Sequence, residues 1–319
     1  MTITKNSYTR GEIAVLLLLA VFIAAALLYL GVQYYEQRQG RVGEPLSQFT
    51  YGQSFALGVV EGVTEFLPVS STGHLELVSY FLDMQTPEAK RAVNAFNIVI
   101  QGAALLAIVG LYRKRVGEMI YGLFNRNDSG RKLLINLFVS FFPAAAVGLL
   151  FDDMIESYLF NPAAIAGALV VGGVLMIWLE RRQRKTNGTG GLEIDAMTWR
   201  MALIVGIAQI FSMWPGTSRS MATILGAMIA GLSLPAAAEY SFLLALPTLG
   251  AASLYKLAKE ASAIFDFASP GVFTVGMVVS AVVAALAVKG FIQFLARGGL
   301  APFGYYRIIL GVAVLWLIS

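Results

Sequence analysis

The sequence EGVTEFLPVSSTGHL, from Glu61 to Leu75, is a polar interruption in an apolar part of the chain. It contains two carboxylates, four hydroxyl side chains and the only histidine of the protein. The apolar limbs around it, Ala56–Leu67 and Leu75–Leu82, are too short to cross a bilayer, because a spanning helix needs about 20 apolar residues. The stretch therefore predicts a helical hairpin that dips into the membrane and returns to the side from which it entered.

A second hairpin of this kind is predicted around PGTSRS, Pro215–Ser220, between the short apolar limbs Met201–Trp214 and Met221–Leu232. Other apolar runs are long enough to span a bilayer at about 1.5 Å of rise per residue. These predicted spanning helices are Phe96–Tyr112, Leu133–Phe151, Ala163–Leu179, Ala236–Tyr255, Val272–Val288 and Phe303–Ile318.

The composition is typical of a multi-pass membrane protein. Hydrophobic residues make up 57% and charged residues 13% of the 319 residues, and the mean hydropathy is +0.71, values outside the range of soluble domains. The apolar runs lack the alternation of barrel strands, so the predicted fold class is all-α. The net charge of +4 resides in short loops and does not indicate nucleic-acid binding. The absence of cysteine excludes disulfides and thiolate chemistry.

The first apolar run, Ile13–Tyr35, is predicted to be a retained membrane anchor rather than a signal peptide. It exceeds the usual signal-peptide core of about 7–15 residues, and no small-residue cleavage site follows it. We therefore expect an N-terminal anchor and linker at 1–46 and a membrane-embedded domain at 47–319.

The charge pattern predicts the topology. Basic residues gather in the loop Arg113–Lys132 and in the linker Arg181–Asp195, which places both in the cytoplasm, whereas the acidic loop Asp152–Asn161 lies outside. The first hairpin then enters from outside and the second from the cytoplasm. Because three spanning helices follow each hairpin, the halves 54–180 and 199–319 are predicted to form inverted-topology repeats.

Glu61 and Glu65 are spaced i, i+4, so their carboxylates share one helix face about 6 Å apart. Burying two acids in a membrane limb is costly. They either cap the helix or pair with basic side chains, or they form a metal site, a proton-handling pair or both. Carboxylate oxygens suit hard cations such as Mg²⁺ and Ca²⁺.

The turn after Pro68 offers hydroxyl and backbone N–H groups from Ser70, Ser71 and Thr72 at the start of the next limb. Such a turn is a candidate anion cradle, and a simple helix cap is the alternative. His74 is either a structural side chain or a general acid–base near neutral pH.

The second hairpin supplies a cation, Arg219, whose guanidinium group at membrane depth suits phosphate or carboxylate oxygens. Its neighbouring hydroxyl side chains are Thr217, Ser218 and Ser220. The alternative is a structural ion pair with Glu61, Glu65 or Glu239. If the hairpin tips meet near the midplane, these groups form one pocket that fits an oxyanion substrate. Glu239 and Arg307 are predicted to be structural, either paired with each other or supporting that pocket.

The motifs EGVTEFLPVSSTGHL and PGTSRSM, together with FNIVIQ, EYSFLLALP and YYRIILG, resemble the undecaprenyl-diphosphate phosphatase family, also called bacitracin resistance proteins. The resemblance runs from about Ser54 to the C-terminus. It implies a bacterial inner-membrane enzyme that hydrolyses undecaprenyl diphosphate to undecaprenyl phosphate and phosphate. Such an enzyme recycles the lipid carrier of cell-wall glycans and contributes to bacitracin resistance. The resemblance also implies a divalent cation, Mg²⁺ or Ca²⁺.

The family's motifs can be carried onto matching positions of this chain. The expected catalytic residues are Glu61, Glu65, Ser71, His74 and Arg219, with Glu61 and Glu65 as metal ligands. The expected substrate-binding residues are Ser70, Thr72, Thr217, Ser218 and Ser220. One departure is Asn97 in FNIVIQ, where the resemblance leads us to expect glutamate.

The hypothesis is that the head group of a polyprenyl diphosphate enters the site from the periplasmic side while the polyprenyl tail stays in the bilayer. Arg219, the hydroxyl groups and a cation neutralise the transferring phosphoryl group, and the nucleophile is Ser71, which we favour, or water. His74 or a glutamate moves the proton. A homodimer is compatible with the sequence. The rival interpretation is a lipid-phosphate transporter or flippase, because inverted repeats with broken helices also build transporters. A purely structural subunit would leave the polar cluster unexplained.

Overall fold

A computed structural model describes residues 49–318 except 83, 85, 160 and 187–189. Within this part the chain forms eleven α-helices and two short 3-10 turns, and an isolated bridge joins Leu192 to Leu232. The predicted all-α class is confirmed. The anchor predicted at Ile13–Tyr35 lies outside the described residues.

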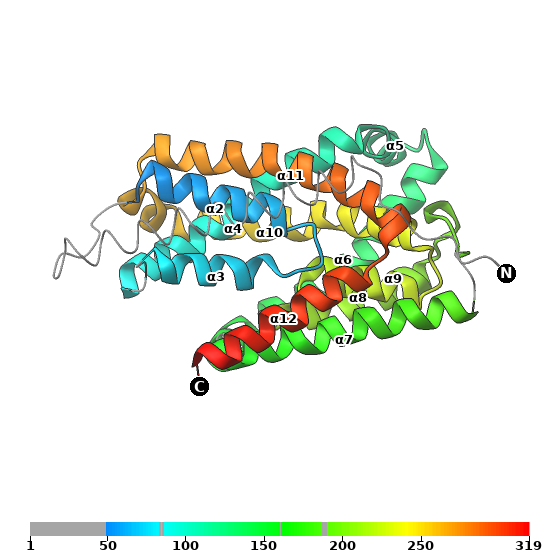
Figure 1. Cartoon of the computed structure of the whole chain (residues 1–319). Helices are drawn as coiled ribbons and strands as arrows, with labels where there is room; N and C mark the ends of the chain where they lie inside the picture. Colours follow the sequence, from blue (N-terminus) through cyan, green and yellow to red (C-terminus); the bar gives the residue numbers. More distant parts are fainter. Residues whose placement is uncertain (1–48, 83, 85, 160, 187–189, 319) are drawn as a thin grey trace.

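Most of the helices run side by side, parallel or antiparallel, in one elongated bundle (Figure 1). In chain order the elements are α2 (Tyr51–Thr64), α3 (Ser71–Phe81), α4 (Pro87–Leu111), α5 (Arg113–Leu123), α6 (Asp128–Leu159), α7 (Pro162–Thr186), η1 (Ile194–Ala196), α8 (Trp199–Ile210), η2 (Phe211–Met213), α9 (Arg219–Ile229), α10 (Leu234–Phe267), α11 (Pro270–Gly298) and α12 (Ala301–Ile318).

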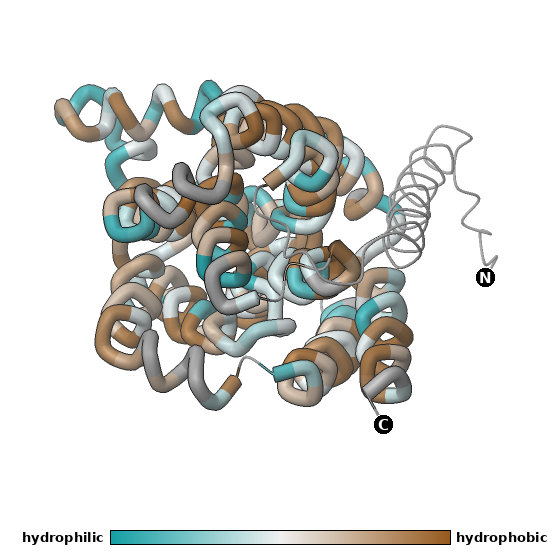
Figure 2. Tube along the Cα trace, turned by 90° about the vertical axis from the view of Figure 1, so that its left-hand side faces the viewer, coloured by the Kyte–Doolittle hydropathy of each residue, from teal (hydrophilic) through white to brown (hydrophobic). Residues whose placement is uncertain are grey.

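Five of these helices, α4, α6, α7, α10 and α11, are long and apolar enough to cross a membrane. Seen from one end of the bundle, hydrophobic positions dominate the helices and hydrophilic positions are scattered among them (Figure 2). The chain is therefore a multi-pass membrane protein. The sixth span predicted in this part, Phe303–Ile318, falls in α12, whose apolar segment is shorter than a full span.

Each polar motif lies where one short helix ends and the next begins, as predicted. The first hairpin consists of α2, with 14 residues, and α3, with 11, while α8 and α9 of the second have 12 and 11. Thr50 starts α2 with a reciprocal hydrogen-bond cap to Gln53. After Thr64 the chain soon reaches Pro68, which cannot continue a helix. In Figure 1, α2 and α3 extend from the left end to the middle, and α8 and α9 lie in the right half.

Small residues let the helices approach closely. α2 packs along α11, α8 along α6, α4 along α10, and α7 along α12. A Cβ atom at Gly58 of α2 would come within 2.8 Å of the Gly276 carbonyl oxygen, and one at Gly206 of α8 within 2.7 Å of the Ser140 carbonyl oxygen. Such contacts are typical of helix packing inside membranes, where close van der Waals contact replaces the hydrophobic effect.

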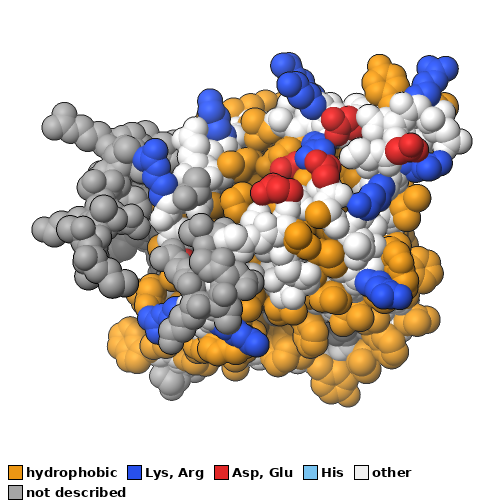
Figure 3. Space-filling view, turned by 90° about the vertical axis from the view of Figure 1, so that its right-hand side faces the viewer, with side chains coloured by type: hydrophobic (Ala, Val, Ile, Leu, Met, Phe, Trp, Pro, Cys, Tyr) orange, Lys and Arg blue, Asp and Glu red, His pale blue; other side chains and the backbone are white. Residues whose placement is uncertain are grey.

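Charged side chains gather on the end of the bundle that lies at the right in Figure 1 (Figure 3). Arg115 of α5 anchors one such cluster: its Nε lies 3.0 Å from Oε1 of Glu239 in α10, and its Nη1 lies 2.9 Å from Oδ1 of Asp195. Of the two roles considered for Glu239 and Arg307, pairing with each other is therefore wrong. Glu239 binds the basic start of α5, whereas Arg307 donates to backbone carbonyls.

Candidate active site

The two hairpin turns have the same unusual backbone feature. Ser70, directly before α3, has a φ of 76°, and Ser218, the N-cap of α9, has a φ of 73°. A positive φ strains a residue with a side chain, and such strain concentrates at functional sites. Each turn also leads into the N-terminus of a short helix, α3 or α9, which is the positive end of the helix dipole.

Arg219 joins the second hairpin to the first. Its Nη2 lies 2.9 Å from Oε1 of Glu65, and the two side chains are 10% and 4% exposed. Its Nη1 donates to the carbonyl oxygen of Ser241 at 3.0 Å. The guanidinium group also lies over the ring of Phe66, 5.7 Å from its centre. Arg219 thus forms the ion pair with Glu65 that the sequence indicated as its alternative role, and the predicted convergence of the arginine and the acidic motif is present.

Ser71 extends this chain of contacts. Its hydroxyl donates to Oε2 of Glu65 at 2.7 Å, so one carboxylate receives both the serine and Arg219. Ser71 is the first residue of α3, and its side chain is buried. A carboxylate at this distance can orient the hydroxyl group and accept its proton.

Glu61 lies one turn before Glu65 on the same face of α2, and it is fully buried. Neither of its carboxylate oxygens has a hydrogen-bond partner in the described part of the chain. Glu65 and Arg219 are close enough to influence it electrostatically. A buried carboxylate without a partner is costly, which makes Glu61 the strongest candidate in this region for holding something the protein itself does not supply.

His74 is held at both ring nitrogens. Its Nδ1 lies 2.7 Å from the carbonyl oxygen of Ser70, which only accepts hydrogen bonds, so Nδ1 carries a proton. Its Nε2 lies 2.6 Å from the hydroxyl oxygen of Tyr306, and the two rings are stacked with centres 5.8 Å apart. In the neutral ring Nε2 therefore accepts from Tyr306. The histidine lies in the first helical turn of α3, and its ring nitrogens contact Ser70 and Tyr306 and not Ser71.

Arg307 ties both turns to the rest of the bundle. Its side chain is fully buried and donates to the carbonyl oxygens of Pro68 at 3.2 Å and Gly216 at 2.9 Å, one from each turn. A third hydrogen bond of 3.1 Å reaches the carbonyl oxygen of Ala168 in α7. The cation thus holds the two turns beside each other.

The remaining predicted hydroxyls lie in the two turns or at the start of the helix that follows, with Thr72 in α3 and Ser220 in α9. Ser70 accepts from the backbone N–H of Gly73 at 3.4 Å, while Ser218 caps α9 at Met221. The hydroxyl groups of Ser218 and Ser220 are 3.4 Å apart. Thr72 and Thr217 make no side-chain hydrogen bond to any described residue, which leaves their hydroxyls free for a ligand.

A metal site made by the protein alone is not found: no group of three or more His, Cys, Asp or Glu side chains among the described residues could hold an ion. Glu61 and Glu65 remain as a pair. Because Mg²⁺ keeps several waters and often takes the rest of its ligands from substrate phosphates, two carboxylates are an adequate protein contribution.

Sequence reasoning missed three groups that shape the site: Tyr306, Ser241 and Phe66. Tyr306 directly precedes Arg307. An arginine inside a late membrane helix is the sequence signal that could have pointed to this region. Ser241 contributes a backbone carbonyl, which sequence does not mark. Asn97, the departure in FNIVIQ, is buried, and its Oδ1 has no partner in the part described.

The model of the family "Bacitracin resistance protein BacA" matches residues 54–313. An undecaprenyl-diphosphatase of Sorangium cellulosum is 48% identical over 264 residues, which cover 82% of this chain and 84% of that protein. The chain belongs to the bacitracin resistance protein family. Two further undecaprenyl-diphosphatases, from Azotobacter vinelandii and Pseudomonas fluorescens, are 44% and 43% identical and are covered over 92% and 94% of their lengths. The resemblance drawn from the two motifs is confirmed.

Proposed function

We propose that this chain is an undecaprenyl-diphosphatase, which hydrolyses undecaprenyl diphosphate to undecaprenyl phosphate and phosphate. The observation that carries the proposal is the contact of Arg219 with Glu65 and of Glu65 with Ser71, which brings a cation, an acid and a hydroxyl group from two hairpins into one buried cluster. The choice of substrate is supported by the family match and by the similar proteins, which are undecaprenyl-diphosphatases.

The diphosphate binds between the two turns. Arg219 is the phosphate-binding cation, because its planar fork matches two oxygens and it lies next to the start of α9. The hydroxyls of the two turns complete the anion site, with Thr72 and Thr217 free to contact phosphate oxygens; the turn residues are Ser70, Thr72, Thr217, Ser218 and Ser220. Stabilisation of charge on the transferring group is the main source of catalysis in phosphoryl transfer.

Ser71 is the favoured nucleophile. Its oxygen attacks the terminal phosphorus, its proton passes to Glu65, and the bond to the bridging oxygen breaks to release undecaprenyl phosphate. Water then attacks the phosphoserine and regenerates the hydroxyl group, with phosphate as the second product. The 2.7 Å contact between Ser71 and Glu65 supports this assignment of the proton. His74, held by Ser70 and Tyr306, is the second acid–base group, on the same turn.

A divalent cation, Mg²⁺ or Ca²⁺, fits beside Glu61. The two unpartnered oxygens of this residue are available as ligands, while Glu65 is already engaged by Arg219 and Ser71. When bound, such a cation would add positive charge next to the phosphate oxygens. Family membership is the second support for a cation requirement.

The two halves, 54–180 and 199–319, are proposed to be inverted repeats. Helix packing supports this proposal. In the proposed correspondence, the helices α2, α3, α4, α6 and α7 match α8, α9, α10, α11 and α12 in that order. The packed pair α2–α11 is then equivalent to the packed pair α8–α6, and the packed pairs α4–α10 and α7–α12 are each equivalent to themselves. Ser70 and Ser218 then occupy equivalent turns and share a positive φ. Gly58 and Gly206 make equivalent close contacts.

The repeats form a membrane-embedded domain, 47–319, which follows an anchor and linker at 1–46. The protein resides in the bacterial cytoplasmic membrane, with the α5 end inside and the site open to the periplasm. The basic residues of Arg113–Lys132 support this orientation.

The test is release of phosphate from undecaprenyl diphosphate by the purified full-length chain in detergent, with and without a chelator. Release that stops with the chelator and returns with Mg²⁺ or Ca²⁺ is the expected result. A lipid-phosphate transporter or flippase would bind the lipid phosphate without releasing it, and that outcome would overturn the proposal.

A further inference from the structure

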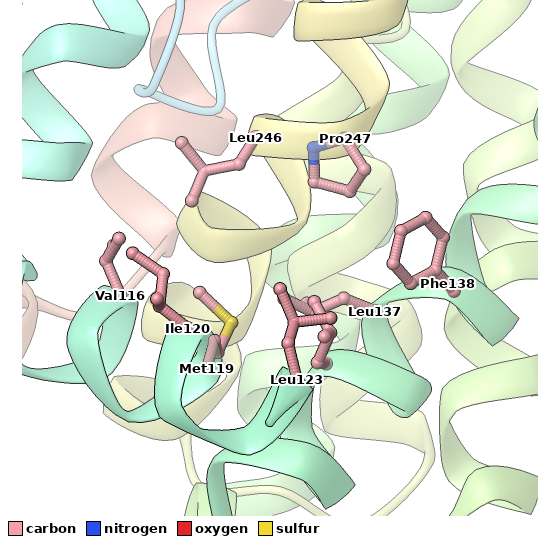
Figure 4. Close-up of a pocket in the computed structure, with 9 residues that line it drawn as sticks. Val116, Met119, Ile120, Leu123, Leu137, Phe138, Leu246 and Pro247 are labelled. Carbon is pink, nitrogen blue, oxygen red and sulfur yellow. The ribbon is translucent and has the colours of Figure 1, made fainter. Parts of the chain in front are cut away.

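A hollow of about 240 Å³ lies between α5, α6 and α10, and none of the predicted site residues lines it (Figure 4). All of its lining side chains are apolar. They are Val116, Met119, Ile120 and Leu123 of α5, Leu134, Leu137 and Phe138 of α6, and Leu246 and Pro247 of α10. Nothing in this lining could bind a polar ligand, so the occupant must be hydrocarbon.

The hollow opens on the side of the bundle. Ile120, Leu123 and Phe138 are 51%, 63% and 54% exposed, which in a membrane protein marks contact with lipid. Leu134 and Phe138 follow the first residue of α6, Asp128, by six and ten positions. At about 1.5 Å per residue the hollow is roughly 9–15 Å from the start of α6, the depth of acyl chains in the adjacent leaflet.

The start of α5 is strongly basic. Arg113 and Lys114 begin the helix, and Arg126 follows its end. All three are exposed, and their side chains have no ion pair within the part of the chain that is described. Arg115 differs, because it is held by Glu239 and Asp195. Arg113 shares a helix face with Val116 and Ile120, at spacings of three and seven, so an unneutralised cation lies on the face of α5 that lines the hollow.

The direction of α5 fits this arrangement. In Figure 1 it is seen nearly along its own axis, whereas α10 and α11 lie across the view. It therefore crosses the direction of the long helices, as an amphipathic helix in the plane of the membrane surface does.

We propose that the hollow and the basic start of α5 bind an anionic phospholipid of the leaflet at the α5 end. One acyl chain enters the hollow, and the phosphate is neutralised by Arg113 and Lys114. An anionic head group is preferred to a zwitterionic one because each basic residue near the surface favours negative lipid. The ion pair of Arg115 with Glu239 holds α5 against α10 beside the hollow.

The test compares lipids retained by the purified full-length chain, measured by native mass spectrometry with phosphatidylglycerol and phosphatidylcholine added in equal amounts. The amount of phosphatidylglycerol retained by the double variant R113Q/K114Q should fall at least about fivefold. The matched control, R181Q/R200Q, removes the same charge from exposed positions elsewhere and should retain phosphatidylglycerol as the wild type does.

A second pair of variants tests the hollow itself. L123W places a larger ring in the hollow and should reduce retention of phosphatidylglycerol to a similar degree, whereas Y121W, exposed on the same helix but outside the lining, should not. Equal retention of both lipids, wild-type retention by R113Q/K114Q, or displacement of the lipid by undecaprenyl phosphate would overturn the proposal. Phosphate release at saturating substrate should be unchanged in all four variants, which separates this test from that of the hydrolase.

Discussion

Nη2 of Arg219 lies 2.9 Å from Oε1 of Glu65, and this ion pair joins the start of α9 to the end of α2. The two residues are 154 positions apart in sequence, and neither hairpin contains both. The anion site is therefore assembled only when the two halves of the chain pack together.

Conservative changes in this pair should remove catalysis. R219K keeps the positive charge but loses the planar guanidinium fork. E65Q keeps the size of the side chain but loses the carboxylate that holds Arg219 and accepts the hydrogen bond of Ser71. We expect phosphate release to fall by about 10²–10³ in each, the range for loss of one stabilising donor at a transition state. Steady-state kinetics in detergent measure this. R200K, exposed at the start of α8, should behave as the wild type; near-normal turnover in R219K would refute the phosphate-binding role.

Ser71 should carry the phosphoryl group. Stopping the reaction in acid with substrate labelled in its terminal phosphate should yield labelled protein, and S71A should abolish both label and turnover. S79A is the matched control, because Ser79 lies on the same helix and its buried hydroxyl has no partner within the described residues. Unlabelled wild-type protein together with full turnover in S71A would establish water as the nucleophile.

The sequence predicted the parts of this site that depend on residue type and spacing. The i, i+4 pair Glu61 and Glu65 and the broken limbs followed from helix periodicity and from the cost of polar groups in a membrane. Arg219 followed because an intramembrane guanidinium needs an anionic partner.

What the sequence did not predict are the contacts that depend on tertiary packing. Tyr306 reaches His74 from a helix 232 positions away, and no local pattern encodes that approach. Arg307 was expected either to pair with Glu239 or to support the pocket, and it binds turn carbonyls, because turns at Pro68 and Gly216 leave backbone acceptors that a helix would satisfy. Backbone acceptors carry no sequence signal.

Tyr306 should position His74. Y306F retains the stacked ring but removes the hydroxyl that donates to Nε2, so the imidazole loses one of its two anchors. We expect kcat to fall by about tenfold, with KM nearly constant, because acid–base groups contribute about 10²–10⁴ and this change only misorients one. Y305F tests the adjacent exposed tyrosine, which binds Arg181, and should leave kcat unchanged. A KM change alone in Y306F would contradict the assignment.

Gly172 of α7 should be needed for the clamp made by Arg307. A Cβ atom at this position would collide with the guanidinium group of Arg307 and with Sδ of Met221. G172A should therefore shift Arg307 away from the carbonyl oxygens of Pro68 and Gly216, at about 1–3 kcal/mol for each acceptor left unsatisfied. Thermal unfolding in detergent should show a lower Tm. In the same helix, G167A has open space around the added methyl group, and an equal fall in Tm for both variants would show that the clamp is not the cause.

Glu61 should be the main protein ligand of the divalent cation, because its two buried oxygens are unpartnered whereas Glu65 already holds Arg219 and Ser71. E61Q keeps the volume and removes the charge, so hard-cation affinity should fall by about tenfold or more. Binding of Mn²⁺, followed by its electron paramagnetic resonance signal, measures this without turnover, and the Mg²⁺ concentration for half-maximal phosphate release should rise in parallel. E118Q, in the middle of α5, removes an equal charge outside the site and should change neither quantity. Unaltered Mn²⁺ binding together with lost activity in E61Q would assign this carboxylate to proton transfer instead.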